Sequence, residues 1–308
     1  MFLAGGTGVI GRCLVPQLVA AGHEVTATTR RPEKVEFLRS LGAVPAVLDA
    51  LDADAVMAAV QAARPDAIMN QLTELPPKYE PKKLGPWYEK TSRLRTDGTR
   101  HLLAAATAVA ARRFVYQSIA FMYSMKGPAV LTEDAPVAIN APDPFGAAVR
   151  ANVEGERLAL ETPSVEGVVL RYGQLYGPGT WFSREGYFGG EARRRRMPVI
   201  GEGTGVMSFV HVEDAASAAV CALTRGTGVY NVVDDEPAPA RECYPAFAAA
   251  VGAPRPWTIP LWIASPLVGK GTAAWLSGLR GASNAKAKQE LGWQPRYPSW
   301  RQGFAEAI

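Results

Sequence analysis

The sequence of 308 residues contains little cysteine, little histidine and little charge. Its three cysteines, Cys13, Cys221 and Cys243, are widely separated, and only 20% of its residues are charged. Scattered thiols exclude a disulfide framework and a structural zinc site, and they are typical of a reducing compartment. A net charge of +4 without a concentrated basic face argues against a nucleic-acid partner. We therefore expect a cytoplasmic protein whose partner is a small molecule.

Long apolar runs are also missing. The longest, such as "AAVCAL" and "PLWIASPLVG", are shorter than the roughly 18 residues that a membrane-spanning helix needs. No basic and then apolar leader precedes the first expected strand, so we expect no membrane span. The four arginines at 193–196 are the one local concentration of charge. We interpret them as a solvated helix end, with phosphate contact as the alternative.

The first half of the chain alternates short apolar runs with helical patterns. The runs "FLAGG", "EVTATTR", "VPAVLD" and "DAIMNQL" predict strands of βαβ units, and therefore a parallel sheet. After Tyr176, glycine, proline and aromatic residues predict loops. We expect an α/β fold, with a doubly wound parallel sheet in residues 1–172 and a smaller substrate lobe in 173–308. Residues from about 206 to 235 should return to the sheet.

The stretch "GGTGVIG" places glycines at positions 5, 8 and 11, between an expected strand and an expected helix. Glycine permits a tight turn and a close approach to a pyrophosphate, which the helix N-terminus then faces. We therefore expect Gly5, Gly8 and Gly11 to bind a dinucleotide. Asp49, after the third strand, is placed to meet the adenine edge or to form a turn. The other residues expected to line the cofactor are Thr7, Val9, Ile10, Ala50, Leu72 and Thr73.

The second strand ends in "TTRRP". An NAD-binding protein commonly has an acidic residue there for the ribose 2′-hydroxyl. Arg30 and Arg31 instead favour a 2′-phosphate, so the sequence predicts NADP rather than NAD. The alternative is a pair of solvated arginines before a helix that starts with proline.

Further motifs follow in order along the chain, and they are "RTDGTRHLLAAA", "RFVYQSIAFMY", "LRYGQLYGPG", "PVIGEGTGVMSFVHVEDAA", "GVYNVVDDEP" and "AKQELGWQP". Together with the glycine fingerprint, they resemble the extended short-chain dehydrogenase/reductase superfamily, in its NAD-dependent epimerase/dehydratase group. The resemblance covers nearly the whole chain. It implies a Rossmann-type domain that holds NAD(P) and a smaller C-terminal lobe that holds substrate.

The resemblance fails at the catalytic positions. The family uses a tyrosine acid, a lysine four residues later, and a serine or threonine that polarises the carbonyl. In this chain these positions hold Phe145, Val149 and Ile119, none of which can exchange a proton. Arg95 stands at a further family position, which is an asparagine. The chain is therefore an atypical member without the Tyr-x-x-x-Lys pair, and its site is either inactive or rebuilt.

Other polar side chains are candidates for a rebuilt site. Tyr123 with Ser118 is the leading catalytic pair, because both lie near the end of the strand that carries the polarising serine in the family. His211 is a weaker candidate for the acid. The apolar stretch that contains Trp257, Trp262 and Trp275 is either core or a site for an apolar or aromatic substrate. The expected substrate-binding residues are Phe145, Arg95, Tyr176 and Trp181.

The leading functional hypothesis is an NADP(H)-dependent oxidoreductase that reduces a conjugated C=C, C=N or C=O bond of an apolar or aromatic molecule. A general acid contributes roughly 10²–10⁴ in rate, so its loss slows hydride transfer without forbidding it. The alternatives are an isomerase, cyclase or lyase that uses bound nucleotide, and a non-catalytic NADP sensor. A homodimer is compatible with the sequence.

Overall fold

The computed structural model describes residues 1–74, 76, 78 and 84–308. Its centre is a sheet of seven parallel strands. The first and the fourth strand in sequence are neighbours in the sheet, and from them the chain adds further strands in opposite directions. Doubly wound sheets bind ligands at such a switch point. In spatial order the strands are β12 (Gly228–Val232), β7 (Glu166–Tyr172), β5 (Arg113–Ile119), β4 (Ala67–Asn70), β1 (Phe2–Ala4), β2 (Thr26–Thr29) and β3 (Val44–Val47).

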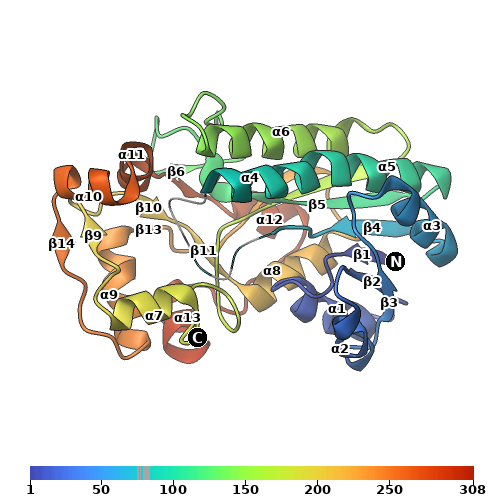
Figure 1. Cartoon of the computed structure of the whole chain (residues 1–308), viewed down its shortest axis with the longest axis horizontal. Helices are drawn as coiled ribbons and strands as arrows, with labels where there is room; N and C mark the ends of the chain where they lie inside the picture. Colours follow the sequence, from blue (N-terminus) through green and yellow to red (C-terminus); the bar gives the residue numbers. More distant parts are fainter. Residues whose placement is uncertain (75, 77, 79–83) are drawn as a thin grey trace.

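Helices cover both faces of this sheet (Figure 1). They are α1 (Gly11–Ala20), α2 (Val35–Ser40), α3 (Ala53–Ala63), α4 (Leu84–Arg93), α5 (Thr99–Ala108), α6 (Phe145–Glu161) and α8 (Val212–Cys221). Helix α1 packs against α8 on one side, while α3 packs against α5 and α4 against α6 on the other. The shorter turns among the described residues are η1 (Pro32–Lys34), the π-helical η3 (Leu94–Gly98) and η4 (Ala120–Met122).

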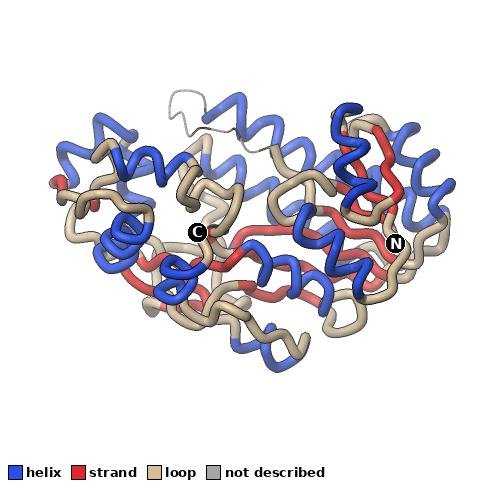
Figure 2. The backbone as a smooth tube through the Cα atoms, turned by 90° about the horizontal axis from the view of Figure 1, so that it is seen from below, coloured by secondary structure: helices blue, strands red, loops and turns tan. Residues whose placement is uncertain are grey.

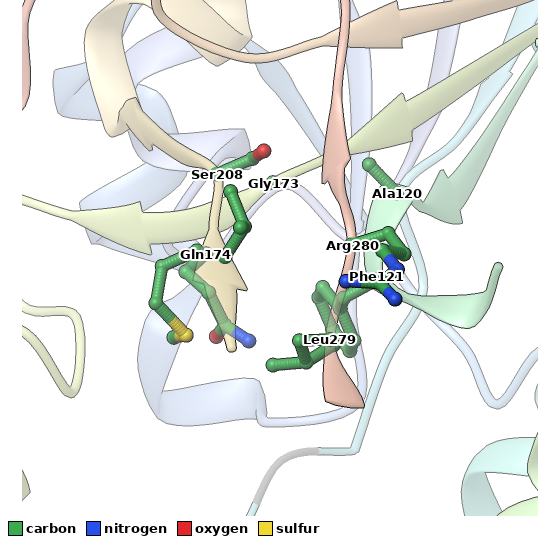
Figure 3. A pocket seen from close by; sticks show the side chains of 9 residues that line it. Ala120, Phe121, Gly173, Gln174, Ser208, Leu279 and Arg280 are labelled. Atoms are coloured by element: carbon green, nitrogen blue, oxygen red, sulfur yellow. The ribbon is translucent and has the colours of Figure 1, made fainter. Parts of the chain in front are cut away.

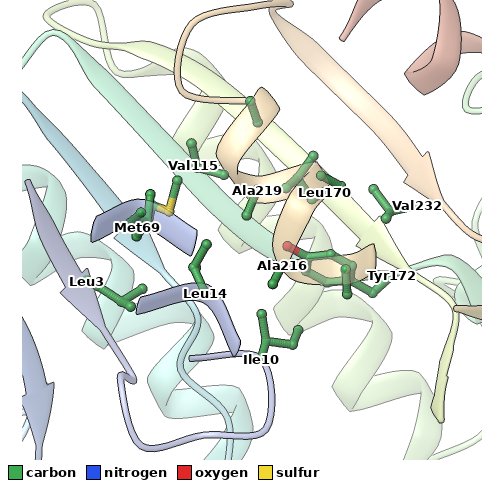
Figure 4. Packing of buried hydrophobic residues seen from close by; sticks show 14 of the residues in the cluster. Leu3, Ile10, Leu14, Met69, Val115, Leu170, Tyr172, Ala216, Ala219 and Val232 are labelled. Atoms are coloured by element: carbon green, nitrogen blue, oxygen red, sulfur yellow. The ribbon is translucent and has the colours of Figure 1, made fainter. Parts of the chain in front are cut away.

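The strands in the middle of the sheet are buried on both faces, whereas the edge strand β3 leaves Val44 and Val47 exposed. Successive side chains point to opposite faces, so Leu3 and Val115 enter the core under α1 and α8 (Figure 4). Phe2 and Phe114 enter the second core, under α3 and α5. The predicted alternation of strands and helices is therefore confirmed as a Rossmann-type α/β fold.

Short paired strands, most of them after β7 in the chain, lie at one end of the large sheet (Figure 2). The pairs are β8 (Gln174–Tyr176) with β11 (Phe209–His211), β9 (Val199–Ile200) with β14 (Thr258–Ile259), β10 (Val206–Met207) with β13 (Ala238–Pro239), and β6 (Val130–Leu131) with β15 (Gly281–Ala282). The helices of this region are α7 (Tyr187–Arg193), α9 (Ala240–Ala250), α10 (Leu261–Val268), α11 (Lys270–Gly278), α12 (Ala285–Glu290) and α13 (Trp300–Glu306).

An aromatic core that includes Phe209, Phe247 and Phe304 holds these elements together. The interpretation of the tryptophan-rich stretch as core is wrong for its first part. Trp257 and Trp262 expose 59% and 76% of their surface, because they lie at the rim of the lobe. Within the described ranges, every helix is too short or too polar to cross a membrane.

Candidate cofactor and substrate site

The turn between β1 and α1 has the geometry of a dinucleotide cradle. Gly5 has a φ of +95°, and a Cβ added there would lie 2.7 Å from the carbonyl oxygen of Gln71. A Cβ on Gly11 would lie 2.2 Å from the oxygen of Gly5, whereas one on Gly8 would meet only that oxygen, at 3.3 Å. Helix α1 thus directs its N-terminal N–H groups toward an open turn, which fits a pyrophosphate. The same turn contains Thr7, Val9 and Ile10, of which Ile10 has its side chain in the core.

Arg30 follows the end of β2, and its side chain is 44% exposed. Its Nη1 lies 2.9 Å from Oε2 of Glu74, and Nζ of Lys90 lies 2.8 Å from the other oxygen of the same carboxylate. Partial burial opposes ionisation of Glu74, but the hydrogen bonds from Lys90 and Arg30 outweigh it and lower its pKa. Arg31 is exposed beside Arg30. An arginine side chain thus stands at the expected 2′-phosphate position, with a carboxylate as its present partner.

The remaining expected cofactor residues follow β3 and β4. Asp49 accepts a hydrogen bond from the backbone N–H of Leu51 at 3.0 Å, so its side chain forms a turn. The next residue, Ala50, is buried. The backbone N–H of Leu72 donates to Oδ1 of Asn70 at 3.1 Å, which fixes the path of the chain toward Thr73. These segments leave the same edge of the sheet as the glycine turn, which is the edge formed by the carboxyl ends of its strands.

Apolar side chains occupy the positions at which we expected the family's catalytic residues. Phe145 begins α6, and its ring centroid lies 5.1 Å from that of Trp275 on α11. Val149, one turn further along α6, is fully buried, and Ile119 ends β5. Phe121 extends the contact, with its ring 6.1 Å from Trp275. The place expected for a tyrosine acid is therefore part of a group of aromatic rings.

Ser118 belongs to a buried polar network. Its hydroxyl is inaccessible to solvent and donates to Oε1 of Glu156 at 2.6 Å. Glu156 also accepts two hydrogen bonds from Arg171, from Nε at 2.8 Å and from Nη2 at 2.6 Å. This bidentate pair joins α6 to β7 and leaves Ser118 in a supporting position beneath the site.

Tyr123 extends the same network and is only 3% exposed. Its hydroxyl donates to Oδ1 of Asn231 at 2.7 Å and accepts from Nη1 of Arg171 at 3.0 Å. Burial raises the pKa of Tyr123, and the neighbouring Arg171 only partly opposes this effect. We expected Tyr123 near the open cleft, but η4 directs the side chain into the protein. The geometry therefore argues against Tyr123 and Ser118 as proton donors to a substrate.

Two residues expected to bind substrate lie inside the protein. Arg95, in the π-helical turn η3, is 6% exposed and donates from Nη1 to the carbonyl oxygen of Gln117 at 3.0 Å. Tyr176 is fully buried between Phe209 and Phe304, and burial raises the pKa of its hydroxyl. Both side chains contribute to packing, so neither is placed to contact a ligand in the cleft.

Trp181 and His211 also have structural partners. The indole N–H of Trp181 donates to the carbonyl oxygen of Pro76 at 3.0 Å, and its ring packs against Phe188. Trp181 is partly exposed and so stays accessible to a ligand. His211 caps α8 by accepting from the backbone N–H of Glu213 at 3.3 Å, and burial lowers its pKa.

A pocket lies between the ends of β5 and β7 and the elements of the smaller lobe (Figure 3). Sequence reasoning did not identify it, because its walls come from four short segments spread between residues 120 and 280. The residues that line it are Ala120, Phe121, Gly173, Gln174, Val206, Met207, Ser208, Leu279 and Arg280.

A family model described as "NAD dependent epimerase/dehydratase family" matches residues 1–232, three quarters of the chain. The chain belongs to this family. A Streptomyces protein named 3-diazoavenalumate denitrifying reductase is 45% identical over 99% of this chain and 98% of its own length. A 2-alkyl-3-oxoalkanoate reductase of Stenotrophomonas maltophilia is 29% identical over 83% of this chain and 76% of its own length.

Solved structures of this family share the fold. UDP-glucose 4-epimerase of Thermotoga maritima, with UDP-glucose, matches 99% of this chain and 96% of its own at a TM-score of 0.78 and 20% identity. A human epimerase family protein with NADPH matches 99% and 98%, at a TM-score of 0.74 and 23% identity. With the family and the reductase relatives established, the chain is an NAD(P)-dependent oxidoreductase of the short-chain dehydrogenase/reductase type, with a nicotinamide cofactor.

Proposed function

We propose that this chain uses NADPH to reduce an electron-poor carbon of a conjugated or aromatic molecule, without a proton from the protein. The observation that carries the proposal is the contrast between the two halves of the site. The glycine cradle is intact, whereas Phe145, at the position that we expect for the family's acid, contacts Trp275. Such a site can bind and orient a cofactor but lacks the tyrosine that protonates an alkoxide.

The chemistry of the substrate decides whether that proton is needed. Reduction of an isolated carbonyl places a negative charge on oxygen, which a nearby acid must neutralise. Bound NADPH supplies a hydride, which carries two electrons to the reacting carbon. If that carbon bears a diazonium group, the two electrons form the C–H bond, and the C–N bonding pair leaves with dinitrogen. Atoms and charge then balance without a proton.

The Streptomyces relative supports this choice, because its name specifies a diazo substrate and the loss of nitrogen. Its identity to this chain extends over almost the whole length of both proteins. We therefore propose a diazo group on a conjugated ring as the acceptor. The name of the Stenotrophomonas relative describes an oxo substrate. Reduction of a carbonyl needs a proton donor, however, and Phe145 cannot donate a proton.

Arg30 favours NADPH over NADH. It stands at the end of β2, and its acidic partner among the described residues is Glu74, in a different segment. A 2′-phosphate carries more negative charge than that carboxylate and more acceptor oxygens, so it can replace Glu74 as the partner of Arg30. In this proposal residues 1–172 hold most of the cofactor, and residues 173–308 contribute the substrate contacts.

The test uses the purified protein, NADPH and 4-diazoniobenzoate as the acceptor. We expect one NADPH to be oxidised for each benzoate formed and each dinitrogen released, faster than in a control without protein. The same reaction with NADH should be slower at equal concentration. The proposal fails if NADPH is not consumed faster than in the control, or if the product retains its nitrogen.

A further inference from the structure

The pocket at the ends of β5 and β7 combines a charged and an aromatic side chain (Figure 3). Arg280, just before β15, and Phe121, after β5, both line it. The free space in the pocket is about 10 Å³, which holds about one water molecule. An aromatic ring would enter only if the side chain of Phe121 rotates outward.

Trp275 connects this pocket to the position of the missing acid. Its ring contacts both Phe121, at 6.1 Å, and Phe145, at 5.1 Å. The three aromatic side chains come from three separate segments, so the fold itself brings them together. The indole Nε1 of Trp275 is buried without a hydrogen-bond partner among the described residues. A buried donor without a partner is unfavourable, and a ligand acceptor would satisfy it.

Arg280 has an unused part of its guanidinium group. Its Nε donates to the carbonyl oxygen of Met125 at 3.1 Å, which fixes the group at the pocket. It forms no ion pair with any acid that the structure describes, and neither terminal nitrogen has a protein acceptor there. The two terminal N–H groups of a guanidinium match the geometry of a carboxylate, so Arg280 is suited to bind one.

We propose that Arg280 binds the carboxylate of an aromatic acid whose ring packs against Trp275, in the space that Phe121 leaves when its side chain rotates outward. This assignment deepens the proposed function, on which it rests for the reaction, and specifies an anionic aromatic substrate. The ring then reaches Phe145, which begins α6 at the family's acid position, while the carboxylate stays at β15. The unpaired N–H of Trp275 is available to a ring substituent such as a phenolic oxygen.

The test measures binding to the NADP⁺-loaded protein, in which no turnover occurs. The probes are trans-cinnamate and methyl cinnamate, which share the ring and differ in charge, and calorimetry gives both dissociation constants. We expect wild type to prefer cinnamate by about 10- to 100-fold, the range of a charge-assisted hydrogen bond. Arg280→Met should remove the preference by weakening cinnamate alone, and Arg280→Lys should retain part of it.

Two further variants complete the design. Arg255→Met removes an exposed arginine outside the pocket and should leave both affinities unchanged. Trp275→Leu should weaken both probes, since both have the ring. The inference is overturned if Arg280→Met keeps the preference, or if neither probe binds wild type at millimolar concentrations.

The outcome separates this inference from the proposed function. Binding of cinnamate that depends on Arg280, in a protein that does not consume NADPH with 4-diazoniobenzoate, supports the pocket and contradicts the reaction. Reduction of 4-diazoniobenzoate with the same KM in wild type and Arg280→Met supports the reaction and contradicts the pocket.

Discussion

Arg30 and Glu74 form an ion pair, with 2.9 Å between Nη1 and Oε2, which links the end of β2 to the segment after β4. Lys90 of α4 binds the second oxygen of Glu74. Because both members of the Arg30–Glu74 pair are partly exposed, the pair itself contributes little to stability. Its importance is positional, since a carboxylate now occupies the place that we propose for the 2′-phosphate.

The first prediction concerns cofactor choice. Arg30→Ala should weaken NADPH binding by roughly 10- to 100-fold and leave NADH binding nearly unchanged, because a charge-assisted bond to the 2′-phosphate is lost. Glu74→Gln should act in the opposite direction, since it frees Arg30 from its competitor. Calorimetry with both cofactors measures these effects. Equal affinities for NADPH and NADH in wild type would contradict the assignment.

The second prediction concerns Tyr123. Its hydroxyl joins Asn231 and Arg171 in a buried network, so Tyr123→Phe should lower the free energy of unfolding by about 1–3 kcal/mol. Turnover of the folded variant should stay close to wild type. Denaturant unfolding and steady-state kinetics with NADPH give the two values. A loss of about 10²–10⁴ in turnover at unchanged stability would instead identify Tyr123 as the acid.

The third prediction restores the family pair. Phe145→Tyr with Val149→Lys should not produce activity on UDP-glucose, because the surroundings of Phe145 are aromatic. Val149 is fully buried, so a lysine there should destabilise the fold. Phe145→Tyr alone is the matched control, since it keeps the apolar residue at 149. Strong epimerase or dehydrogenase activity on UDP-glucose in the double variant would show that the lobe accepts nucleotide sugars.

The alternation of apolar runs predicted the large sheet, because the runs correspond to its strands, most of which are buried on both faces. The glycine fingerprint likewise predicted the turn at Gly5. Both features depend on residues that are close in sequence, where period and spacing carry the information.

The partners of Tyr123 and Ser118 could not be predicted in this way. Glu156 and Arg171 come from α6 and β7, and only the packing of these elements on β5 brings the four side chains together. Arg280 was overlooked for the same reason. The position of Arg280 depends on the pairing of β15 with β6. A strand of two residues is too short to have a recognisable sequence pattern.

The fourth prediction concerns pH. Burial raises the pKa of Tyr123 and lowers that of His211, so both shifts move these groups away from titration between about pH 7 and pH 8. We expect kcat/KM for reduction by NADPH to vary little between about pH 7 and pH 8, provided that the acceptor does not titrate there. A bell-shaped profile in this range would indicate a protein acid and base.

The central claim is that hydride reaches carbon without a proton from the protein, and isotope transfer tests it most directly. The reaction would use NADPH deuterated at the transferring position of nicotinamide C4, with 4-diazoniobenzoate, in ordinary water. The account predicts one deuterium in the product benzoate, at the carbon that lost nitrogen, with one dinitrogen released for each deuterium transferred. Benzoate that contains solvent hydrogen at that carbon, or a product that keeps its nitrogen, would contradict the account.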